Sequence, residues 1–378
     1  MTPDIPRHPG PLSGIRVLEV GHILAGPFAG MLLADLGADV IKIEPATGDL
    51  SRQVGSNSVG EHNVYFASLN RNKRSVHIDL SASEGQEHLG RLAKDAHALL
   101  VNLRPSAIRK LGLDYESLRR HNERIVCVAL TGYGLHGPAS EWPSFDYVVQ
   151  AQVGVADMTG EPGGPPTLAG YSAVDNSAGI MAALGLLAKI IEGKGGQVDV
   201  SLFDVMLAQL NYKAAAFLNG EGPPQRRPLG AHTFYVPAQL FETSSGYVSI
   251  FVARDDLWRR LCAEVGRPEW GDDPRFVTMQ ARFENRDELV GQLSGLLKKA
   301  PAVEWEARLR PLGIPVGAVV NLGEALGTDL VSSHRMVVSV NTDDGPLKMI
   351  GSPIHIDDCR LEYRPPPHLH EHTTELIP

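Results

Sequence analysis

The sequence predicts an α/β protein with two lobes, and three observations lead to this fold class. Residues 15–44 alternate strand, helix and strand, and residues 85–134 repeat that alternation. The chain has 378 residues, more than one ordinary hydrophobic core holds. We therefore expect a parallel sheet covered by helices, together with a smaller second lobe.

The first strand, helix and strand read IRVLEVG, FAGMLLADLGA and DVIKIE, and the loop HILAGP joins the first two. Glu44 ends the second strand about where dinucleotide-binding folds place the acid that binds ribose. The glycines disagree with that role, because Gly21, Gly26 and Gly30 are separated by four and three residues rather than spaced as GxGxxG. This stretch alone predicts a general α/β crossover rather than an NAD site.

The second alternation has a helix at 85–96, a strand at HALLVNL, a short helix at 107–111 and a strand within RIVCVALTGYG. Basic residues gather before it, in LNRNKRS, and after its first strand, at Arg104, Arg109 and Lys110. Arginine can bind a phosphate through two parallel hydrogen bonds, and lysine can bind it as a point charge. These residues could therefore bind the phosphates of a nucleotide. Taken alone, these residues are expected to be solvated surface charge.

A loop rich in glycine and proline, residues 159–170, precedes Asp175, and a predicted helix at Ser177–Glu192 follows, ended by Gly193. Aspartate commonly caps helix starts, and this structural role is what the position alone predicts. The position also has chemical value, because backbone amides and the helix dipole would keep a carboxylate ionised and stabilise negative charge beside it. Asp175 is therefore the first candidate for chemistry.

Further along, QVDVSLFDVMLAQL predicts a strand and a helix, and the composition breaks at Gly220–Pro228. We predict that residues 1–219 form the first part of the large domain, that 220–317 form a small domain, and that 318–378 return to the large domain and end in a tail. The tail PPPHLHEHTTEL holds three histidines but no cysteine and no fixed frame, so no metal site is predicted. No GxSxG or HExxH occurs, which disfavours serine hydrolysis and zinc proteolysis.

The composition of the chain limits the cellular compartments and the classes of binding partner that we expect. The net charge of -9 disfavours a nucleic-acid partner. Cys127, Cys262 and Cys359 lie far apart and form no CxxC, which predicts neither a disulfide nor a zinc site and suits a reducing cytoplasm. The N-terminus lacks the apolar core of a signal peptide, and the most apolar stretch, Gly179–Ile191, is shorter than the roughly 20 residues of a membrane span. Neither export nor membrane spanning is expected.

Several motifs follow one another along the chain: PLSGIRVLEVGHILAGPFAGMLLADLGADVIKIEPATGD, LNRNKRSVHIDL, LTGYGLHGP, DNSAG, GQVDVSLFD, GIPVGAV and EHTTEL. With them the chain resembles the family III CoA-transferases, also called the CaiB/BaiF family, from Leu12 nearly to its C-terminus. The resemblance implies a large Rossmann-like domain built from both chain ends, a smaller α+β domain and an interlocked homodimer. It also implies an acyl-CoA and a carboxylic acid acceptor as substrates, with no permanently bound cofactor.

The resemblance makes Asp175 the nucleophile and assigns CoA binding to residues that match the family's motifs. These residues are His22, Ile23, Leu24, Ala25, Arg52, Leu69, Asn70, Arg71, Asn72, Lys73, Arg74, Asn102, Leu103, Lys110, Thr131, Gly132 and Tyr133. The residue after Glu44, often basic in the family, is Pro45 here, so Arg52, Arg74 or Lys110 would supply more of the phosphate contact. The glycine-rich loop of oxalate-using members is reduced to Gly230, which argues against oxalate.

The chemistry suits a carboxylate that acts without a base. With an ordinary aspartate pKa of about 3.9, Asp175 is expected to be ionised at neutral pH and to attack a thioester carbonyl directly. An aspartyl anhydride and then an aspartyl-CoA thioester would follow, with succinyl-CoA as an example of a donor and a small dicarboxylate as acceptor. His22, His232 and Arg226 are candidate contacts of the acid.

Two alternatives stay open. The α-methylacyl-CoA racemases resemble this chain but carry Gly-His-Asp where it reads Ser144-Phe145-Asp146, and phenylalanine cannot carry a proton. A catalytically silent acyl-CoA-binding protein would keep Asp175 merely as a helix cap.

Overall fold

The structure, a computed structural model, describes residues 10–377, which form two compact units. The first unit comprises the chain up to Val153, Ala169–Ala215 and the chain from Asp329 onward, and the second comprises Gly154–Leu168 and Ala216–Thr328. The predicted small domain at 220–317 lies within the second unit, which also includes most of the glycine-rich loop. Most of the N-terminal segment considered for a signal peptide lies outside the described residues.

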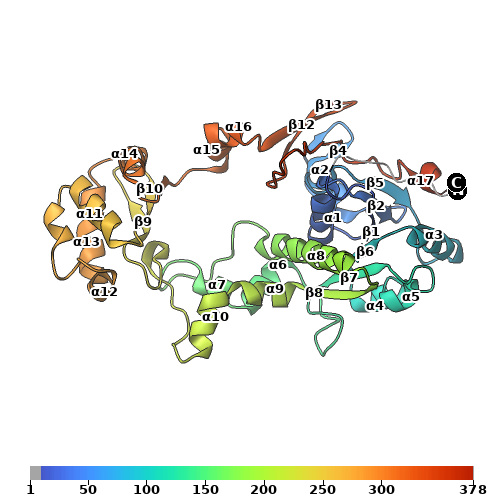
Figure 1. The fold of residues 1–378 in the computed structure, drawn as a ribbon, viewed down its shortest axis with the longest axis horizontal. Helices are drawn as coiled ribbons and strands as arrows, with labels where there is room; N and C mark the ends of the chain where they lie inside the picture. The colour runs from blue at the N-terminus through green and yellow to red at the C-terminus, as the bar shows by residue number, and fades with distance from the viewer. Residues whose placement is uncertain (1–9, 378) are drawn as a thin grey trace. The chain divides into compact units, whose positions relative to one another are not determined.

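The core of the first unit is a six-stranded parallel sheet (Figure 1). Its strands, in spatial order, are β5 (Arg74–His77), β2 (Asp39–Glu44), β1 (Arg16–Val20), β6 (Ala98–Val101), β7 (Val126–Thr131) and β8 (Gly196–Ser201). The order runs outward in both directions from β1 and β6, as in doubly wound nucleotide-binding folds, so the topological switch point lies between these two strands. The α/β class predicted from sequence is confirmed.

Helices cover both faces of this sheet. The helices of the first unit are α1 (Ala25–Asp35), α2 (Val64–Asn70), α3 (Ser83–Lys94), α4 (Pro105–Lys110), α5 (Tyr115–Leu118), α6 (Asp146–Gln152), α8 (Ala173–Glu192), α9 (Leu202–Gln209), α10 (Asn211–Leu218), α16 (Asp329–Ser333) and α17 (Thr373–Leu376). On one face, Leu18 and Ile41 of the sheet pack with Leu89 of α3 and Ile108 of α4. On the other face, α1 and α8 pack against each other and against the strands.

Several parts of this unit differ from the expected elements. The helix α8 begins at Ala173, four residues before the predicted start, and ends at Gly193 as predicted, with that glycine at φ 76°. The helix α2 and the strand β5 were not predicted. The strand β5 is only four residues long and reads Arg-Ser-Val-His. A burial pattern this short gives too little periodicity to identify a strand.

The contact between α1 and α8 depends on a glycine. A Cβ atom at Gly179 would lie 2.8 Å from the backbone oxygen of Ala25 and 3.0 Å from Cδ1 of Phe28. No larger residue fits without moving one of the helices. Gly179 stands one turn after Asp175 on α8, so the first turn of α1 is fixed close to Asp175.

The C-terminal segment returns to the first unit. Strands β12 (Val337–Thr342) and β13 (Gly345–Ile350) form an antiparallel hairpin whose apolar side packs on Ala67 of α2. The tail then runs along β5, where the His372 amide donates to the Ser75 backbone oxygen at 2.9 Å. The edge of the sheet is thereby covered.

The second unit has its own core. It contains the antiparallel sheet β11 (Val316–Ala318), β10 (Tyr247–Phe251) and β9 (Ala238–Glu242) and the helices α7 (Val155–Met158), α11 (Asp255–Glu264), α12 (Met279–Glu284), α13 (Arg286–Leu297), α14 (Ala302–Leu309) and α15 (Leu322–Leu326). Trp258 and Phe276 are fully buried at its centre. These elements make an α+β unit with a separate hydrophobic cluster.

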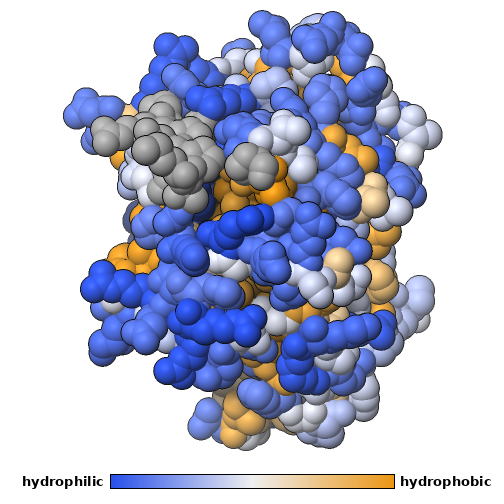
Figure 2. Space-filling view, turned by 90° about the vertical axis from the view of Figure 1, so that its right-hand side faces the viewer, coloured by the Kyte–Doolittle hydropathy of each residue, from blue (hydrophilic) through white to orange (hydrophobic). Residues whose placement is uncertain are grey.

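The surface and the longest helix both bear on whether the chain could cross a membrane. The face shown in Figure 2 is mostly hydrophilic, with small separated apolar areas. One helix among the described residues, α8, is long and apolar enough to cross a membrane by length and composition. The sequence analysis took the apolar segment to be too short for a membrane span. That was wrong, since α8 has 20 residues. Its packing on α1, β7 and β8 is that of a core helix of the fold.

Candidate active site

A cavity of about 330 Å³ opens where β1, β6 and β7 end, beside the switch point of the sheet. Nine residues predicted to act in catalysis or CoA binding line it: His22, Ile23, Leu24, Ala25, Asn102, Leu103, Thr131, Gly132 and Asp175. All but Asp175 follow or end the strands, and the carboxyl ends of parallel strands meet at one edge of a sheet. The structure thus brings the predicted nucleophile and half of the predicted CoA set into one cavity.

Asp175 does not cap the helix that carries it. It is the third residue of α8, and the amides of Val174 and Asp175 donate to Oδ2 of Asp146 at 2.7 and 3.0 Å. Asp146, the buried first residue of α6, therefore supplies the cap from 29 residues earlier. The expected capping role of Asp175 was wrong, and its carboxylate accepts no hydrogen bond from the described residues.

The environment of Asp175 favours its neutral form. Burial, and then the negative charge of Asp146, raise the pKa of Asp175 to about 7. The expectation of an ordinary aspartate pKa was therefore wrong for the free protein. A carboxylate that binds its proton this tightly is also a stronger nucleophile once it is ionised, because nucleophilicity rises with basicity.

The loop from Ser140 to Phe145 supplies lining residues that sequence reasoning placed only in part. Ser140, Trp142, Pro143 and Ser144 were not predicted, and Phe145 was noted only as the position of the racemase histidine. Phe145 is 68% exposed and lines the same cavity as Asp175. The other lining residues not predicted for the site are Leu50, Pro105, Leu130 and Leu202, together with Arg104.

Tyr65 of α2 was missed altogether. Burial and then the charges of Asp175 and Asp49 raise the pKa of the Tyr65 phenol, so this side chain lies within the electric field of the nucleophile. No sequence signal identified it, because α2 itself was not predicted.

The loop after β1 is held by Asn102, which follows β6. The His22 amide donates to Oδ1 of Asn102 at 2.9 Å, and Nδ2 of Asn102 donates back to the His22 carbonyl at 3.0 Å. A Cβ at Gly21 would meet Oδ1 of Asn102 at 2.3 Å, and one at Gly26 would meet its Cγ at 2.9 Å. These glycines make room for a side chain of the protein rather than for a pyrophosphate, which agrees with the absence of a dinucleotide fingerprint.

A second cavity of about 560 Å³ adjoins the first and shares His22 and Leu103 with it. It lies at the carboxyl ends of β2 and β5, where Glu44, Pro45 and His77 line it. Its other lining residues are Val20, Ile43, Ala46, Thr47, Ile78, Asp79, Leu80, Ser81 and Leu111. Together the two cavities extend along the edge of the sheet on which doubly wound folds bind nucleotides.

Nine predicted CoA-binding residues do not line the first cavity, and eight of them are Arg52, Leu69, Asn70, Arg71, Asn72, Lys73, Arg74 and Lys110. Tyr133 does not line it either; its hydroxyl donates to Gln152 at 2.8 Å. Residues 69–73 precede β5, so they lie at the amino ends of the strands, opposite the cavity edge. Their contact with CoA stays a prediction that this geometry does not favour.

The basic side chains of this segment are occupied by buried ion pairs. Arg71 pairs with Asp35 at 2.6 Å, Lys73 with Glu19 at 2.7 Å and Arg74 with Asp39 at 2.7 Å. The expectation of solvated surface charge was wrong for these three, which are at most 8% exposed. Arg52 likewise pairs with Glu44 at 2.7 Å. Arg104 and Lys110, by contrast, are exposed as expected.

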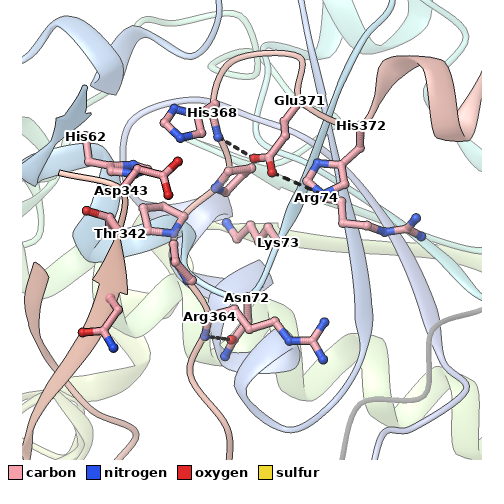
Figure 3. A pocket seen from close by; sticks show the side chains of 14 residues that line it. His62, Asn72, Lys73, Arg74, Thr342, Asp343, Arg364, His368, Glu371 and His372 are labelled. Atoms are coloured by element: carbon pink, nitrogen blue, oxygen red, sulfur yellow. Dashed lines mark hydrogen bonds and ion pairs between the residues drawn. The ribbon is translucent and has the colours of Figure 1, made fainter. Parts of the chain in front are cut away.

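The remaining candidates are placed elsewhere. Figure 3 shows His368, Glu371 and His372 of the tail around another cavity with Asn72, Lys73 and Arg74. No group of three or more metal-ligating side chains occurs among residues 10–377. His232 and Arg226 belong to the second unit, where Arg226 donates to the backbone oxygen of Gly164 at 2.6 Å.

Comparison with known proteins identifies the family. The profile of CoA-transferase family III matches residues 12–373. The succinate–glutarate CoA-transferase of Agrobacterium fabrum is 34% identical over 99% of this chain and 96% of its own length. The acetyl-CoA:oxalate CoA-transferase of Acetobacter aceti is 34% identical over 94% of this chain and 92% of its own.

Solved structures agree. A CaiB/BaiF family protein from Brucella suis is similar with a TM-score of 0.84 and 32% identity, covering 97% of this chain and 98% of its own. The Mycobacterium tuberculosis protein Rv3272 gives a TM-score of 0.87 at 30% identity, over 98% of this chain and 100% of its own. The chain is a family III CoA-transferase.

The raised pKa of Asp175 gives the first prediction. Because only the ionised form attacks, acylation of Asp175 should rise with pH through about 7. Asp146→Asn keeps an oxygen for the α8 amides but removes the neighbouring charge, so the midpoint should fall by roughly one pH unit. Single-turnover acylation rates between pH 5 and 9 measure this. Glu192→Gln, at the exposed far end of α8, should leave the midpoint unchanged, and an unshifted midpoint in Asp146→Asn would contradict the assignment.

Proposed function

We propose that the protein transfers CoA from an acyl-CoA to a small dicarboxylate through covalent intermediates on Asp175. One observation carries this proposal. Asp175 presents a carboxylate without a hydrogen-bond donor among the described residues, inside a cavity lined by the loop after β1 and by the ends of β6 and β7. A nucleophile needs this freedom, whereas a structural carboxylate is normally hydrogen-bonded.

The reaction needs neither a metal nor ATP, because one thioester replaces another. The Asp175 carboxylate attacks the thioester carbonyl, the carbon–sulfur bond breaks, and CoA thiolate leaves from an aspartyl acyl anhydride. The thiolate attacks the aspartyl carbonyl and releases the donor acid, which leaves an aspartyl-CoA thioester. The acceptor carboxylate attacks that thioester to form a new anhydride and thiolate. Thiolate attack on the acceptor carbonyl then frees Asp175 and the new acyl-CoA.

Each of these steps develops negative charge on a carbonyl oxygen, and the first turn of α1 is placed to stabilise it. Leu24 and Ala25 line the cavity, and their amides donate to no acceptor among residues 10–377. Free amides at a helix start carry partial positive charge. A backbone donor of this kind contributes on the order of 3 kcal/mol to an acyl-transfer transition state.

The two adjoining cavities suggest how CoA lies. Its thioester would reach Asp175 in the first cavity, while its nucleotide would follow the sheet edge into the second, where Thr47 and Ser81 offer hydroxyls. Arg104 lines the first cavity and forms no ion pair within the described part of the chain, so it is available for a phosphate or for the free carboxylate of a diacid. The relative named for succinate and glutarate supports a dicarboxylate. The single glycine at Gly230 still argues against oxalate.

The covalent route predicts a label on Asp175. When enzyme, acyl-CoA and hydroxylamine are mixed, the peptide that contains Asp175 should become a hydroxamate, and Asp175→Ala should lose transfer by at least about 1,000-fold. Asp175→Asn should behave alike, since an amide is a poor nucleophile. Both variants should still bind CoA in calorimetry. Transfer at wild-type rates by either variant, with deamidation excluded by mass spectrometry, would contradict the mechanism.

A racemase is the second candidate function, and Phe145 argues against it. Racemisation needs a proton carrier on each face of the α-carbon, but the position of the racemase histidine is Phe145, which faces the cavity with no titratable group. The wild-type protein should therefore exchange no α-proton of a 2-methylacyl-CoA in deuterated water, as measured by NMR. Rapid exchange that disappears in Asp175→Ala would establish the racemase instead, and new CoA esters from succinyl-CoA would exclude a silent binding protein.

The helix α8 supports the expected homodimer. Ile180, Leu184 and Ile191 form an apolar stripe on this helix and are 52%, 57% and 84% exposed. Such a stripe is normally covered by another chain. We expect a dimer in analytical ultracentrifugation at micromolar concentration, and Leu184→Glu should shift it toward monomer. A wild-type monomer would contradict this proposal. A cytoplasmic location remains a prediction of the sequence.

A further inference from the structure

The loop that faces Asp175 contains a strained residue. Between β1 and α1 the chain turns at Gly21–Leu24, and Ile23 adopts a φ of 67°. A β-branched side chain is strongly disfavoured in this left-handed region, because its Cβ substituents crowd the backbone. A conformation of this kind persists only where surrounding groups hold it, and such residues cluster at functional sites.

Asp49 holds Ile23. The Ile23 amide donates to Oδ1 of Asp49 at 3.1 Å, and the Ser51 amide and hydroxyl fix the same oxygen at 2.8 and 2.7 Å. Asp49 is fully buried and does not line the cavity, and its contacts with the loop are the Ile23 amide and, at 3.9 Å, Nδ1 of His22.

Lys42 in turn holds Asp49. Its Nζ lies 2.7 Å from Oδ2 of Asp49 and 2.8 Å from Oε1 of Glu19, and it donates to the Gly21 carbonyl at 3.0 Å. Lys73 completes the cluster with a 2.7 Å contact to Oε2 of Glu19. Two acids and two bases thus neutralise one another beneath α1, and two members of the cluster reach the loop, Asp49 at the Ile23 amide and Lys42 at the Gly21 carbonyl.

We propose that Asp49 is a positioning residue for acylation: it holds Ile23 in its left-handed conformation, so that the Leu24 and Ala25 amides face the reacting carbonyl oxygen beside Asp175. This inference rests on the proposed function. The loop geometry supports it, because Leu24 and Ala25 directly follow Ile23 and line the cavity. Release of Ile23 would let the turn relax and carry these amides away from the oxyanion, and a misplacement of about 1 Å costs roughly 100-fold in rate.

The decisive variants are Asp49→Asn and Ile23→Gly. An amide has a single oxygen, which the buried Lys42 ammonium should attract, so the Ile23 amide loses its acceptor. We expect Asp49→Asn to slow acylation of Asp175 about 100-fold in hydroxylamine-quenched single turnovers. Glycine adopts the left-handed conformation without strain, so in the Ile23→Gly background the same Asp49→Asn change should slow acylation less than about 10-fold. A purely structural role of Asp49 would show no such dependence on residue 23.

Two further variants serve as controls for folding and for general loss of stability. Asp49→Glu keeps the negative charge beside Lys42, so it should fold where Asp49→Asn does not, while its displaced oxygens should still release Ile23 and give the same dependence on glycine. Asp35→Asn removes the partner of the buried Arg71 at the other end of α1 and should leave acylation unchanged, although the protein becomes less stable.

The outcomes separate the two proposals. Wild-type enzyme without a hydroxamate on Asp175 refutes the proposed covalent function. Labelled wild-type enzyme with unimpaired Asp49 variants overturns the positioning role, and so does a loss that is equally large in the Ile23→Gly background. A loss of acylation in Asp35→Asn as great as in Asp49→Asn would overturn it as well, since general destabilisation would then explain both. Slow acylation that depends on Ile23 supports it.

Discussion

The start of α8 depends on a carboxylate from another helix. Any helix leaves its first amides without partners, and here Asp146 accepts from two of them. With this need met, Asp175 on the same turn is not required as a cap. The capping charge also remains next to Asp175 and, after burial, contributes to its raised pKa. One interaction therefore orders the helix that packs on α1 and the sheet, leaves Asp175, the proposed nucleophile, free of capping, and adjusts its basicity.

The fold also accepts buried charge beneath the loop between β1 and α1. Lys42 and Glu19 point from the central strands toward α1, where apolar side chains would be expected in a parallel sheet. Gly30 of α1 leaves space for them, because a Cβ there would lie 1.9 Å from Oε2 of Glu19. Buried ion pairs seldom add net stability, so their presence under the catalytic loop agrees better with a requirement for fixed geometry.

The sequence predicted the parts of the molecule that are specified locally. The periodicity of residues 15–44 is enough to identify β1, α1 and β2. Asn102 and Thr131 were assigned to CoA binding by the family resemblance, and not by any local pattern. What it could not predict depends on distant partners. Asp146 caps α8 across 29 residues, and Arg74 is buried because Asp39 lies on the neighbouring strand. Neither partner can be paired from a single sequence, so a cap and a solvated surface were expected where the structure has a free carboxylate and a buried ion pair.

The glycines of the first turn show how this chain differs from a dinucleotide-binding protein of the same topology. In those proteins glycine lets a pyrophosphate approach the helix that follows the first strand. Here Asn102 fills the space at Gly21 and Gly26, so a phosphate cannot occupy it. In the proposed function, the positive end of α1 would then serve the oxygen of a reacting carbonyl beside Asp175, and the nucleotide of CoA would lie further along the sheet edge. A fold that elsewhere binds phosphate at this helix start can in this way use the same partial charge for acyl transfer.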